Sequence, residues 1–400
     1  MKSKLLKYGL LCAFIFCMQL ISFAQIGPLL LDVTQLKNNR EKIRAKDPIF
    51  LKAYQSLILE ADEALKYGPV SVMEKNTIPP SGSKHDYMSL APYHWPDPTK
   101  SDGLPYIRKD GQTNPEVKLY KDKDYLPELC SNVYKLAFAH YYSGDKKYLN
   151  HAIKLINVWF LDSATKMNPN MNFGQAIKGE NTGRGAGLID ARHFIKVIDA
   201  IGLMNSEGAF PKQDLKLMQS WFLDFSGWMQ TSKNGKDELS AKNNHGVWYD
   251  ALRLSISLFN QQKVVAKNII ENAQLRLNNQ MDENDRFPLE MARTTSLHYS
   301  VFVIDAFLKI AKMAESADMD FWYYQGKSNH SLKAAVDKMV PYLLKEKKWD
   351  GPQIKPFDFG EGIGILDAAS NKYACAKCKT FLDDYYNQQK YSHLLLTGNF

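Results

Sequence analysis

The chain has 400 residues, of which 45% are hydrophobic, and its formal net charge is +8 at neutral pH. Loss of the first 24 residues would remove Lys2, Lys4 and Lys7 and no acid, which lowers the charge from +8 to +5. This small surplus helps to attract an acidic polymer, but it is far below the clustered basic charge of a nucleic-acid-binding protein. No Pro-, Ser- or Gly-rich linker divides the chain. We therefore expect one domain, no nucleic-acid partner and an acidic carbohydrate as the ligand.

The N-terminal residues have the pattern of a secretory signal peptide. Three lysines are followed by an apolar run over residues 8–23, and Ala24 ends it. We expect residues 1–24 to be removed and residues 25–400 to form the mature domain. Cys17 lacks the small residues that precede a lipid-modified cysteine, so ordinary cleavage is favoured. No later stretch is apolar for long enough to span a bilayer, and we expect no membrane insertion.

The first half of the mature chain alternates helices with two irregular segments. Apolar spacing predicts a helix over 51–67 and a pair over 129–142 and 148–160, separated by a short polar break. Segment 76–116 is rich in Pro, Gly and aromatic residues, and segment 168–184 is rich in Asn and Gly. Long irregular loops in a compact domain usually carry function. We expect both segments to form walls of a substrate groove.

The second half of the chain is predicted to be almost entirely helical. Short polar breaks separate the helices, which is typical of consecutive antiparallel hairpins. The number and pairing of the helices predict an all-α fold, an incomplete α/α toroid of about six or seven antiparallel hairpins; no sequence repeat supports the ring independently. The expected helices cover 189–204, 213–229, Val247 to Leu258, 261–281, Leu297 to Ala311 and 332–344.

A first group of candidate catalytic residues lies at the start of a predicted helix. Asn243 and Asn244 are good helix-capping residues, and the apolar period begins at Val247. His245 would then lie in the first turn, where free backbone N–H groups and the helix dipole favour a bound carboxylate. The alternative is that both asparagines only cap the helix and that His245 is an ordinary interface residue.

A second group contains Arg293 and Tyr299. On one continuous helix, six residues apart, they would not share a face. Thr295 or Ser296, however, can cap a helix that begins just beyond them, which leaves Arg293 on the preceding turn and free to point inward. In the alternative interpretation, Arg293 pairs with Glu290 and Tyr299 packs in the core.

The two groups together suit β-elimination from a uronic acid. The hydrogen on C5 is poorly acidic, because its removal adds negative charge next to a carboxylate. Asn, His or Arg donors on that carboxylate stabilise the enolate-like transition state. A tyrosine with a lowered pKa can then remove the proton, and a Tyr or His can protonate the departing O4. This chemistry needs no metal and no other cofactor.

The sequence resembles the alginate lyase superfamily, polysaccharide lyases with α/α-toroid folds. The resemblance rests on Asn244-His245, on Arg293 with the Leu297-His298-Tyr299 run, and on the loop over residues 84–96, which together span most of the mature chain. It implies that Asn244 and Arg293 neutralise the carboxylate and that Tyr299 acts as base, acid or both, with His245 assisting. With mannuronate one tyrosine would serve both roles. With guluronate His245 would be the base and Tyr299 the acid.

Further residues are candidates for binding sugar units next to the cleaved bond. Aromatic and histidine side chains of the first irregular segment can stack on sugars or bond to them, and basic or amide side chains of later segments can contact carboxylates. Each has a structural alternative, such as pinning a loop or, for Arg192 with Asp190, a surface ion pair. The candidate substrate-binding residues are Tyr93, His94, Trp95, Gln175, Arg184, Arg192, His193 and His298.

Three cysteines remain after the signal peptide, so they cannot all pair. Cys375 and Cys378 have a spacing seen in redox and zinc motifs, but no second such pair completes a metal site. A local disulfide or two free thiols is expected, and Cys130 is left over. No metal ligand is assigned.

Other functions remain open at this point. A glucuronan lyase of the same fold would use the same residues. A glycoside hydrolase needs two facing carboxylates, and Asp86, Asp97, Glu290 and Glu361 show no diagnostic spacing. A glycan-binding uptake protein would usually carry a lipid anchor. We expect a monomer exported across the inner membrane, in the periplasm rather than the medium.

Overall fold

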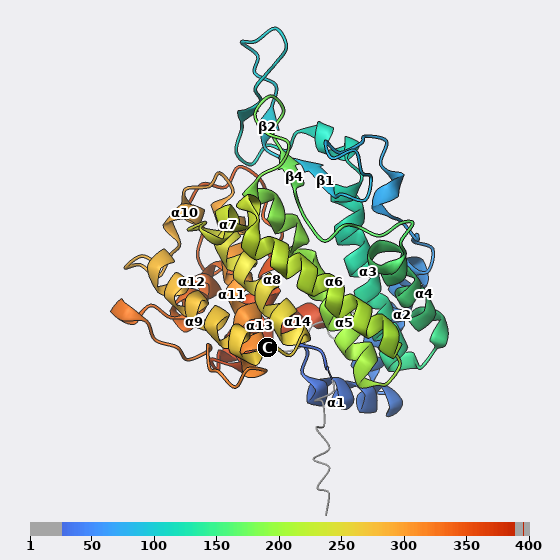
Figure 1. Cartoon of the computed structure of the whole chain (residues 1–400). Helices are drawn as coiled ribbons and strands as arrows, with labels where there is room; N and C mark the ends of the chain where they lie inside the picture. Colours follow the sequence, from blue (N-terminus) through green and yellow to red (C-terminus); the bar gives the residue numbers. More distant parts are fainter. Residues whose placement is uncertain (1–25, 389–394, 396–400) are drawn as a thin grey trace, which may run out of the picture.

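A computed structural model describes residues 26–388 and Leu395, and the expected signal peptide lies outside these residues. The described chain is mostly α-helical (Figure 1). Its α-helices are α1 (Val33–Arg44), α2 (Pro48–Ala64), α3 (Asp122–Ser143), α4 (Lys146–Ile156), α5 (Phe194–Ser206), α6 (Lys212–Thr231), α7 (Lys233–Leu239), α8 (Asn244–Phe259), α9 (Lys263–Gln280), α10 (Pro288–Met291), α11 (Ser296–Glu315), α12 (Leu332–Leu343), α13 (Ile363–Asn371) and α14 (Ala376–Gln388).

Short elements connect these helices. The strands are β1 (Met88–Leu90), β2 (His94–Trp95), β3 (Ile107–Arg108) and β4 (Phe173–Ala176). Single turns of 3-10 helix are η1 (Val72–Glu74), η2 (Pro115–Leu119), η5 (Lys327–Asn329) and η6 (Phe359–Gly362); η4 (Gly185–His193) is longer, and η3 (Asn157–Leu161) is a π-helical turn.

Consecutive helices pack as antiparallel pairs around one large apolar core. Helix α3 packs on α2 and α4, α8 packs on α9, and α13 packs on α12 and α14. Contacts between helices that are distant in sequence, α3 with α5 and α8 with α11, join the pairs. The all-α prediction and the α/α-toroid class are confirmed, and the number of hairpins stays a prediction. In the part of the chain that is described, no helix is long and apolar enough to cross a membrane.

The helix ends follow local sequence rules. Asp47 accepts hydrogen bonds from two backbone N–H groups at the start of α2, and Pro48 occupies the first helical position, where it needs no N–H partner. Gly144 ends α3 with a φ of 72°, a left-handed conformation that glycine adopts without steric cost. Asp145 then caps α4. The predicted break between the first helical pair is therefore confirmed.

One helix prediction needs correction, and helix α1 was missed. The helix expected over 189–204 begins only at Phe194, because η4 precedes it. In η4 the backbone of Gly187 lies so close to Gly174 that a Cβ atom on Gly187 would approach it to 2.3 Å. Helix α1 was not predicted, because in its twelve residues only Leu36 and Asn39 are buried and the apolar period is weak.

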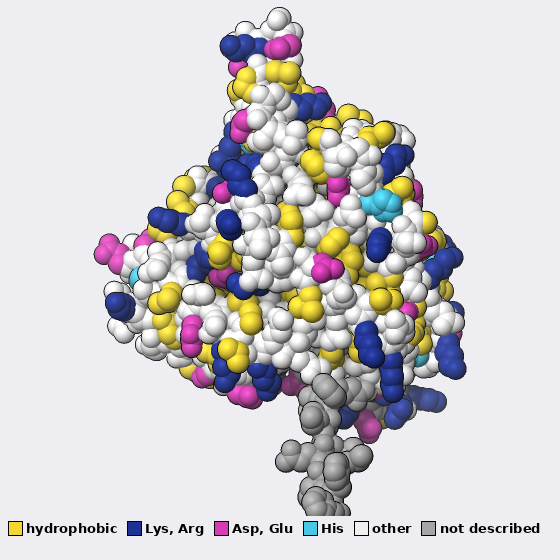
Figure 2. All heavy atoms as spheres, viewed as in Figure 1, with side chains coloured by type: hydrophobic (Ala, Val, Ile, Leu, Met, Phe, Trp, Pro, Cys, Tyr) yellow, Lys and Arg dark blue, Asp and Glu magenta, His cyan; other side chains and the backbone are white. Residues whose placement is uncertain are grey.

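The two irregular segments meet above one end of the helices. Strands β1 and β4 pair in parallel, which brings residues about 85 positions apart side by side. Strands β2 and β3 form an antiparallel hairpin that projects from the body as an arm (Figures 1 and 2). We call residues 91–114 the arm. Its base is closed by the hydrogen bond from Lys109 N to Tyr93 O, 2.7 Å, and by that from Asn114 N to Pro92 O, 2.8 Å.

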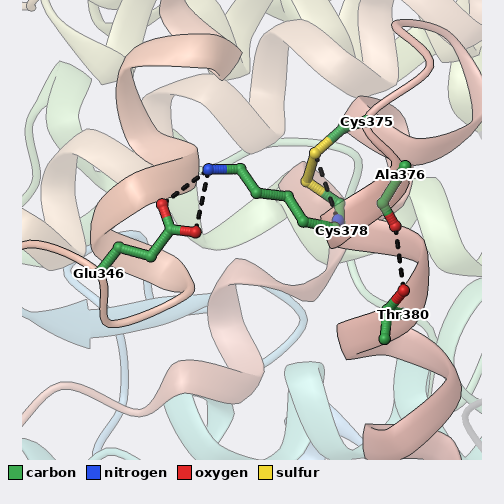
Figure 3. Close-up of a disulfide and its surroundings, with 6 residues drawn as sticks. Glu346, Cys375, Ala376, Cys378 and Thr380 are labelled. Carbon is green, nitrogen blue, oxygen red and sulfur yellow. Dashed lines mark hydrogen bonds and ion pairs between the residues drawn. A yellow bond between two sulfur atoms is a disulfide. The ribbon is translucent and has the colours of Figure 1, made fainter.

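At the other end of the chain, Cys375 and Cys378 form a disulfide at the start of α14 (Figure 3). This is the first of the two alternatives that the sequence left open. Cys130 is buried in α3 and unpaired. Lys377 forms an ion pair with Glu346 that ties α14 to the segment after α12. Basic side chains on the face seen in Figure 2 are scattered among acidic ones and form no continuous stripe.

Candidate functional site

The first group of candidate residues starts α8 as the sequence predicts. Asn243 is the N-cap and accepts a hydrogen bond from the backbone N–H of His245. Asn244 is fully buried, and it has a partner that the sequence did not reveal. Its backbone N–H and its Nδ2 donate to the two carboxylate oxygens of Glu290, at 2.7 and 2.9 Å. The second asparagine is therefore more than a cap.

This pairing changes what Asn244 presents to a ligand. Its Nδ2 is used by Glu290, and its Oδ1 is buried with no hydrogen-bond partner among the described residues. In this orientation the free atom is an acceptor and not the donor that the sequence analysis expected. Burial raises the pKa of Glu290, although hydrogen bonds from Asn244 and the charges of Arg293 and His245 act in the opposite direction.

His245 lies in the first turn of α8 and is oriented by Glu238. Its Nδ1 is 2.7 Å from Glu238 Oε1, and the side chain of Glu238 is only 3% exposed. A carboxylate can only accept, so Nδ1 carries the hydrogen in this contact. The other nitrogen, Nε2, then keeps its lone pair when the ring is neutral. Glu238, on the short helix α7, was not among the predicted site residues.

Arg293 lies on the turn before α11, as expected, but its partner is not Glu290. Its Nε and Nη2 donate to the carboxylate of Asp110 in the arm, with the shortest contact at 2.6 Å. Thr294 adds its backbone N–H and its hydroxyl to the same carboxylate. The alternative of an Arg293–Glu290 ion pair is therefore wrong. Two of the three guanidinium nitrogens of Arg293, Nε and Nη2, are therefore engaged by Asp110.

Tyr299 lies in the first turn of α11, between Arg293 and the arm. The guanidinium carbon of Arg293 is 3.6 Å from the centre of the Tyr299 ring. The phenol donates a hydrogen bond to the hydroxyl of Tyr93, at 3.0 Å. Burial raises the pKa of Tyr299 well above its usual value, and the charge of Arg293 only partly offsets this. The expected lowered pKa is thus not found, and the phenol is protonated.

Three further candidates, Gln175, Arg184 and Arg192, bond to the backbone or to buried side chains. Gln175 is buried, has a φ of 49° and donates to Asp190. Arg184 donates to the backbone and side-chain oxygens of Gln175, each at 3.1 Å. Arg192 donates to Ile189 O, so a surface pair of Arg192 with Asp190 is not found. Asp190 is 3% exposed and accepts from Lys123.

The histidine candidates lie in different surroundings. His94 has a buried Nδ1 without a partner among the described residues, and burial with the charges of Arg184 and Arg108 lowers its pKa. Burial also lowers the pKa of His193, to about 2. His298 contacts Glu361 and stacks on Phe302.

The aromatic candidates of the arm differ in what their polar atoms do. The indole N–H of Trp95 is used by Gln112 O, at 2.9 Å, which pins the arm to itself. The indole N–H of Trp95 therefore has the structural role of pinning the loop. Tyr93, in contrast, places its hydroxyl on Tyr299.

Hydrogen bonds and charge interactions connect the candidates into one closed chain. Asn244 donates a hydrogen bond to Glu290, and Arg293 and His245 both act to lower the pKa of Glu290. From Arg293 the chain runs through Asp110 to Arg108, whose charge reaches His94. From His245 it runs through Glu238 to Arg184, whose charge also reaches His94. The structure thus brings together Asn244, His245, Arg293, Tyr299, Tyr93, His94, Arg184 and Gln175.

The carboxylates considered for a hydrolase are dispersed. Asp86 accepts from Asn168 and Asn170, and Asp97 caps its own turn in the arm. Glu290 is held by Asn244, and Glu361 is held by His298. No two of these face each other across a shared contact. Within residues 26–388, no group of three His, Cys, Asp or Glu side chains has the arrangement of a metal site.

Comparisons with known proteins concern the family and the fold of the chain. The model of the family described as alginate lyase matches residues 71–349. An alginate lyase from Bacteroides ovatus is 38% identical, with a TM-score of 0.86 over 92% of this chain and 98% of that chain. Alginate lyase A1-III from Sphingomonas species A1 shares the fold at 14% identity and a TM-score of 0.52, over 92% of this chain and 95% of that chain. A variant of alginate lyase A1-III complexed with tetrasaccharide has a TM-score of 0.56 at 15% identity, over 88% of this chain and 90% of that chain. A search of curated proteins gave no significant match.

Proposed function

Because this chain belongs to the alginate lyase family and is a polysaccharide lyase, we propose that it cleaves alginate by β-elimination without a metal ion. The observation that carries the proposal is that one connected group of side chains contains both a protonated phenol and an oriented imidazole. Tyr299 is held neutral under Arg293, and His245 is held by Glu238 with Nε2 free. One group can give a proton and the other can take one.

The proton transfers follow from these two states. His245 Nε2 removes the hydrogen from C5 of the uronate, and the electron pair of that C–H bond forms the C4=C5 double bond. The C4–O4 bond breaks, and O4 takes the phenolic proton of Tyr299. Arg293 lies over the ring and stabilises the phenolate that remains. This role replaces part of the carboxylate contact that the sequence analysis gave to Arg293, because Asp110 already neutralises it.

Asn244 is the group best placed for the substrate carboxylate, provided that its amide turns. A carboxylate needs a donor, so Nδ2 must face the substrate and Oδ1 must face Glu290. Two acceptors would then oppose each other unless Glu290 carries a proton. The raised pKa of Glu290 lowers the free-energy cost of this proton uptake. Carboxylate binding and protonation of Glu290 are therefore coupled.

The sugar's stereochemistry decides whether one residue or two are needed. In guluronate a separate base and acid are required, which His245 and Tyr299 supply. In mannuronate a single tyrosine can serve both roles, but it must begin as phenolate, which the raised pKa of Tyr299 opposes. The protonation states favour the two-residue route. A His245→Gln variant that loses cleavage of guluronate blocks and keeps cleavage of mannuronate blocks would show that the enzyme uses both routes.

Substrate profiling tests the activity directly. The protein is incubated with alginate, glucuronan, pectate and hyaluronan, and the ultraviolet absorbance of the unsaturated product is followed. A rise with alginate supports the proposal. A rise with glucuronan alone would make it a glucuronan lyase, and reducing ends without absorbance would indicate hydrolysis. Export to the periplasm is part of the proposal, and cell fractionation tests it.

The Tyr299→Phe variant tests the mechanism. It removes the transferred proton and leaves the ring under Arg293, so we expect kcat to fall by about 10²- to 10⁴-fold, with tetrasaccharide affinity nearly unchanged. Tyr323→Phe is the matched control, because Tyr323 is 60% exposed and its hydroxyl bonds only to Lys372 O among the described residues. Equal turnover in the two variants would remove Tyr299 from the mechanism.

A further inference from the structure

Basic side chains gather inside the protein at the N-terminal end of α5. Arg192 and His193 end η4, and Lys196 lies in the first turn of α5. Lys309 comes from α11. Burial lowers the pKa of Lys196, and the charges of Lys309 and Arg192 lower it further, so the three cations lie close together. We call Arg192, Lys196 and Lys309 the interior cationic cluster.

Solvent reaches the cluster although protein surrounds it. By surface area the side chain of Lys196 is exposed, yet loss of hydration is the main cause of its lowered pKa. A lysine on the outer surface stays hydrated and shows little such effect. Arg192 and His193 behave in the same way, since both are only half-buried by area and both are strongly desolvated. These side chains are therefore both crowded by protein and accessible to solvent.

The cluster lacks the negative charge that would balance it. Asp305 is the acid that pairs with Lys309, and its charge also acts on Lys196. Asp190 contributes to Arg192 but is already paired with Lys123. Three cations therefore share one acid that is not otherwise committed. Lys196 itself forms no hydrogen bond or ion pair with any described residue.

Helix geometry adds to this imbalance. The N-terminus of α5 is the positive end of its dipole, where cations are unfavourable and anions are stabilised. His193, at the N-cap position, makes no side-chain capping bond, and its ring nitrogens have no hydrogen-bond partner in the described chain. An electrically unfavourable arrangement of this kind is relieved when an anion enters.

The cluster lies near Tyr299. Tyr299 is among the titratable groups close enough to Arg192 to influence its pKa. The guanidinium carbon of Arg192 is 5.4 Å from the centre of the Phe302 ring. The centres of the Phe302 and Trp248 rings are 5.0 Å apart. The Nζ of Lys309 is 5.7 Å from the centre of the Trp248 ring. Aromatic rings beside fixed cations are the surroundings in which proteins bind charged sugars.

We propose that the interior cationic cluster is a subsite that binds the carboxylate of a uronate unit next to the one being cleaved. Lys196 and Lys309 supply the charge, Arg192 connects the subsite to Tyr299, and Phe302 supports the sugar ring. This assignment rests on the proposed function and adds residues, Lys196 and Lys309, that neither the motifs nor the first group of site residues included.

Binding of an alginate tetrasaccharide to charge-deleted variants tests the subsite. Lys196→Met keeps the alkyl stem and removes only a repelled charge, so the protein is expected to fold with an unchanged or higher melting temperature. The dissociation constant should rise about tenfold, and Lys196→Arg should restore binding. Lys309→Met should act in the same direction. Lys267→Met, at an exposed position on α9, is the matched control and should bind like the wild type.

A carboxyl-reduced tetrasaccharide separates charge from shape. It should bind weakly, and equally well to the wild type and to Lys196→Met. If Lys196→Met binds the acidic tetrasaccharide as tightly as Lys267→Met does, while the wild type cleaves alginate, the subsite is refuted and the proposed function stands. If the wild type neither cleaves alginate nor binds the tetrasaccharide, the proposed function and the subsite both fall.

Discussion

Asp110 gives the sharpest test of how the site is held together. The Asp110→Asn variant keeps the shape of the side chain but removes the charge that Arg293 and Arg108 face. The Arg293 and Asp110 side chains are only 13% and 19% exposed, so little solvent screens the loss. Hydrogen bonds to charged groups contribute about 1.5–3 kcal/mol each, and breaking a buried pair costs about 3–5 kcal/mol. Allowing for the partial exposure, we expect a loss of about 2–4 kcal/mol.

This loss converts into a measurable change in melting temperature. Unfolding entropy is about 2.1 cal/mol/K per residue, and over roughly 360 residues that gives about 0.8 kcal/mol/K. The melting temperature should therefore fall by roughly 3–5 °C in calorimetry. Asp102→Asn is the matched control, since Asp102 is an exposed carboxylate of the same arm that only caps Leu104. If both variants melt at the same temperature, the arm is not anchored through Asp110.

The pH dependence of the same variant has a definite sign. Burial alone would raise the pKa of Asp110, but the hydrogen bonds from Arg293 and Thr294 outweigh it and hold the pKa well below its usual range. A carboxyl group with a lowered pKa contributes its stability above the unfolded-state pKa, about 3.9, and loses it as the pH falls through the folded-state value. The difference between wild type and variant should be complete at pH 7 and shrink only below about pH 4. A gap that closes near neutral pH would contradict the assignment.

Two further variants probe buried carboxyl groups. In Glu290→Gln, an amide N–H permanently supplies the hydrogen that the turned Asn244 requires. The kcat/KM of the wild type should therefore fall as the pH rises through the pKa of Glu290, whereas that of the variant should not. Identical pH profiles would exclude the coupling. Burial raises the pKa of Asp199 to about 6, so its ionisation costs up to roughly 3 kcal/mol. A raised carboxyl pKa means stability that is present below the unfolded-state value and lost above the folded one. The melting temperature of wild type relative to Asp199→Asn should therefore be lower at pH 8 than at pH 4.5, and a difference that does not change with pH would refute it.

The sequence predicted the parts of this fold that local rules determine. The periods beginning at Val247 and Leu297 mark the buried faces of α8 and α11, and Asn243 caps α8 as expected. Helices α7 and α13 were not predicted, because they are short and a short apolar period does not distinguish a helix from other structure. The start of α5 was misplaced because the close contact of Gly187 with Gly174 depends on a distant segment.

In the candidate site, too, the sequence predicted what depends on local residues and missed what depends on tertiary contacts. Residue types and spacing identified Asn244, His245, Arg293 and Tyr299. Their partners Glu238 and Asp110 were missed, since each lies in a segment whose position depends on tertiary packing. Without those partners, the sequence suggested a free Arg293 and a tyrosine of lowered pKa. The structure places Arg293 on Asp110 and keeps Tyr299 protonated.

The arm touches the reacting groups at both of its ends. Tyr93, just before β2, receives the Tyr299 hydrogen bond, and Asp110, just after β3, receives Arg293. Any attempt to exchange this hairpin with that of a homologue must therefore carry over two complementary contacts at once. A chimera that matches only one end would leave either a phenol or a guanidinium unsupported, and protein engineers should treat the hairpin and the turn before α11 as a single cassette.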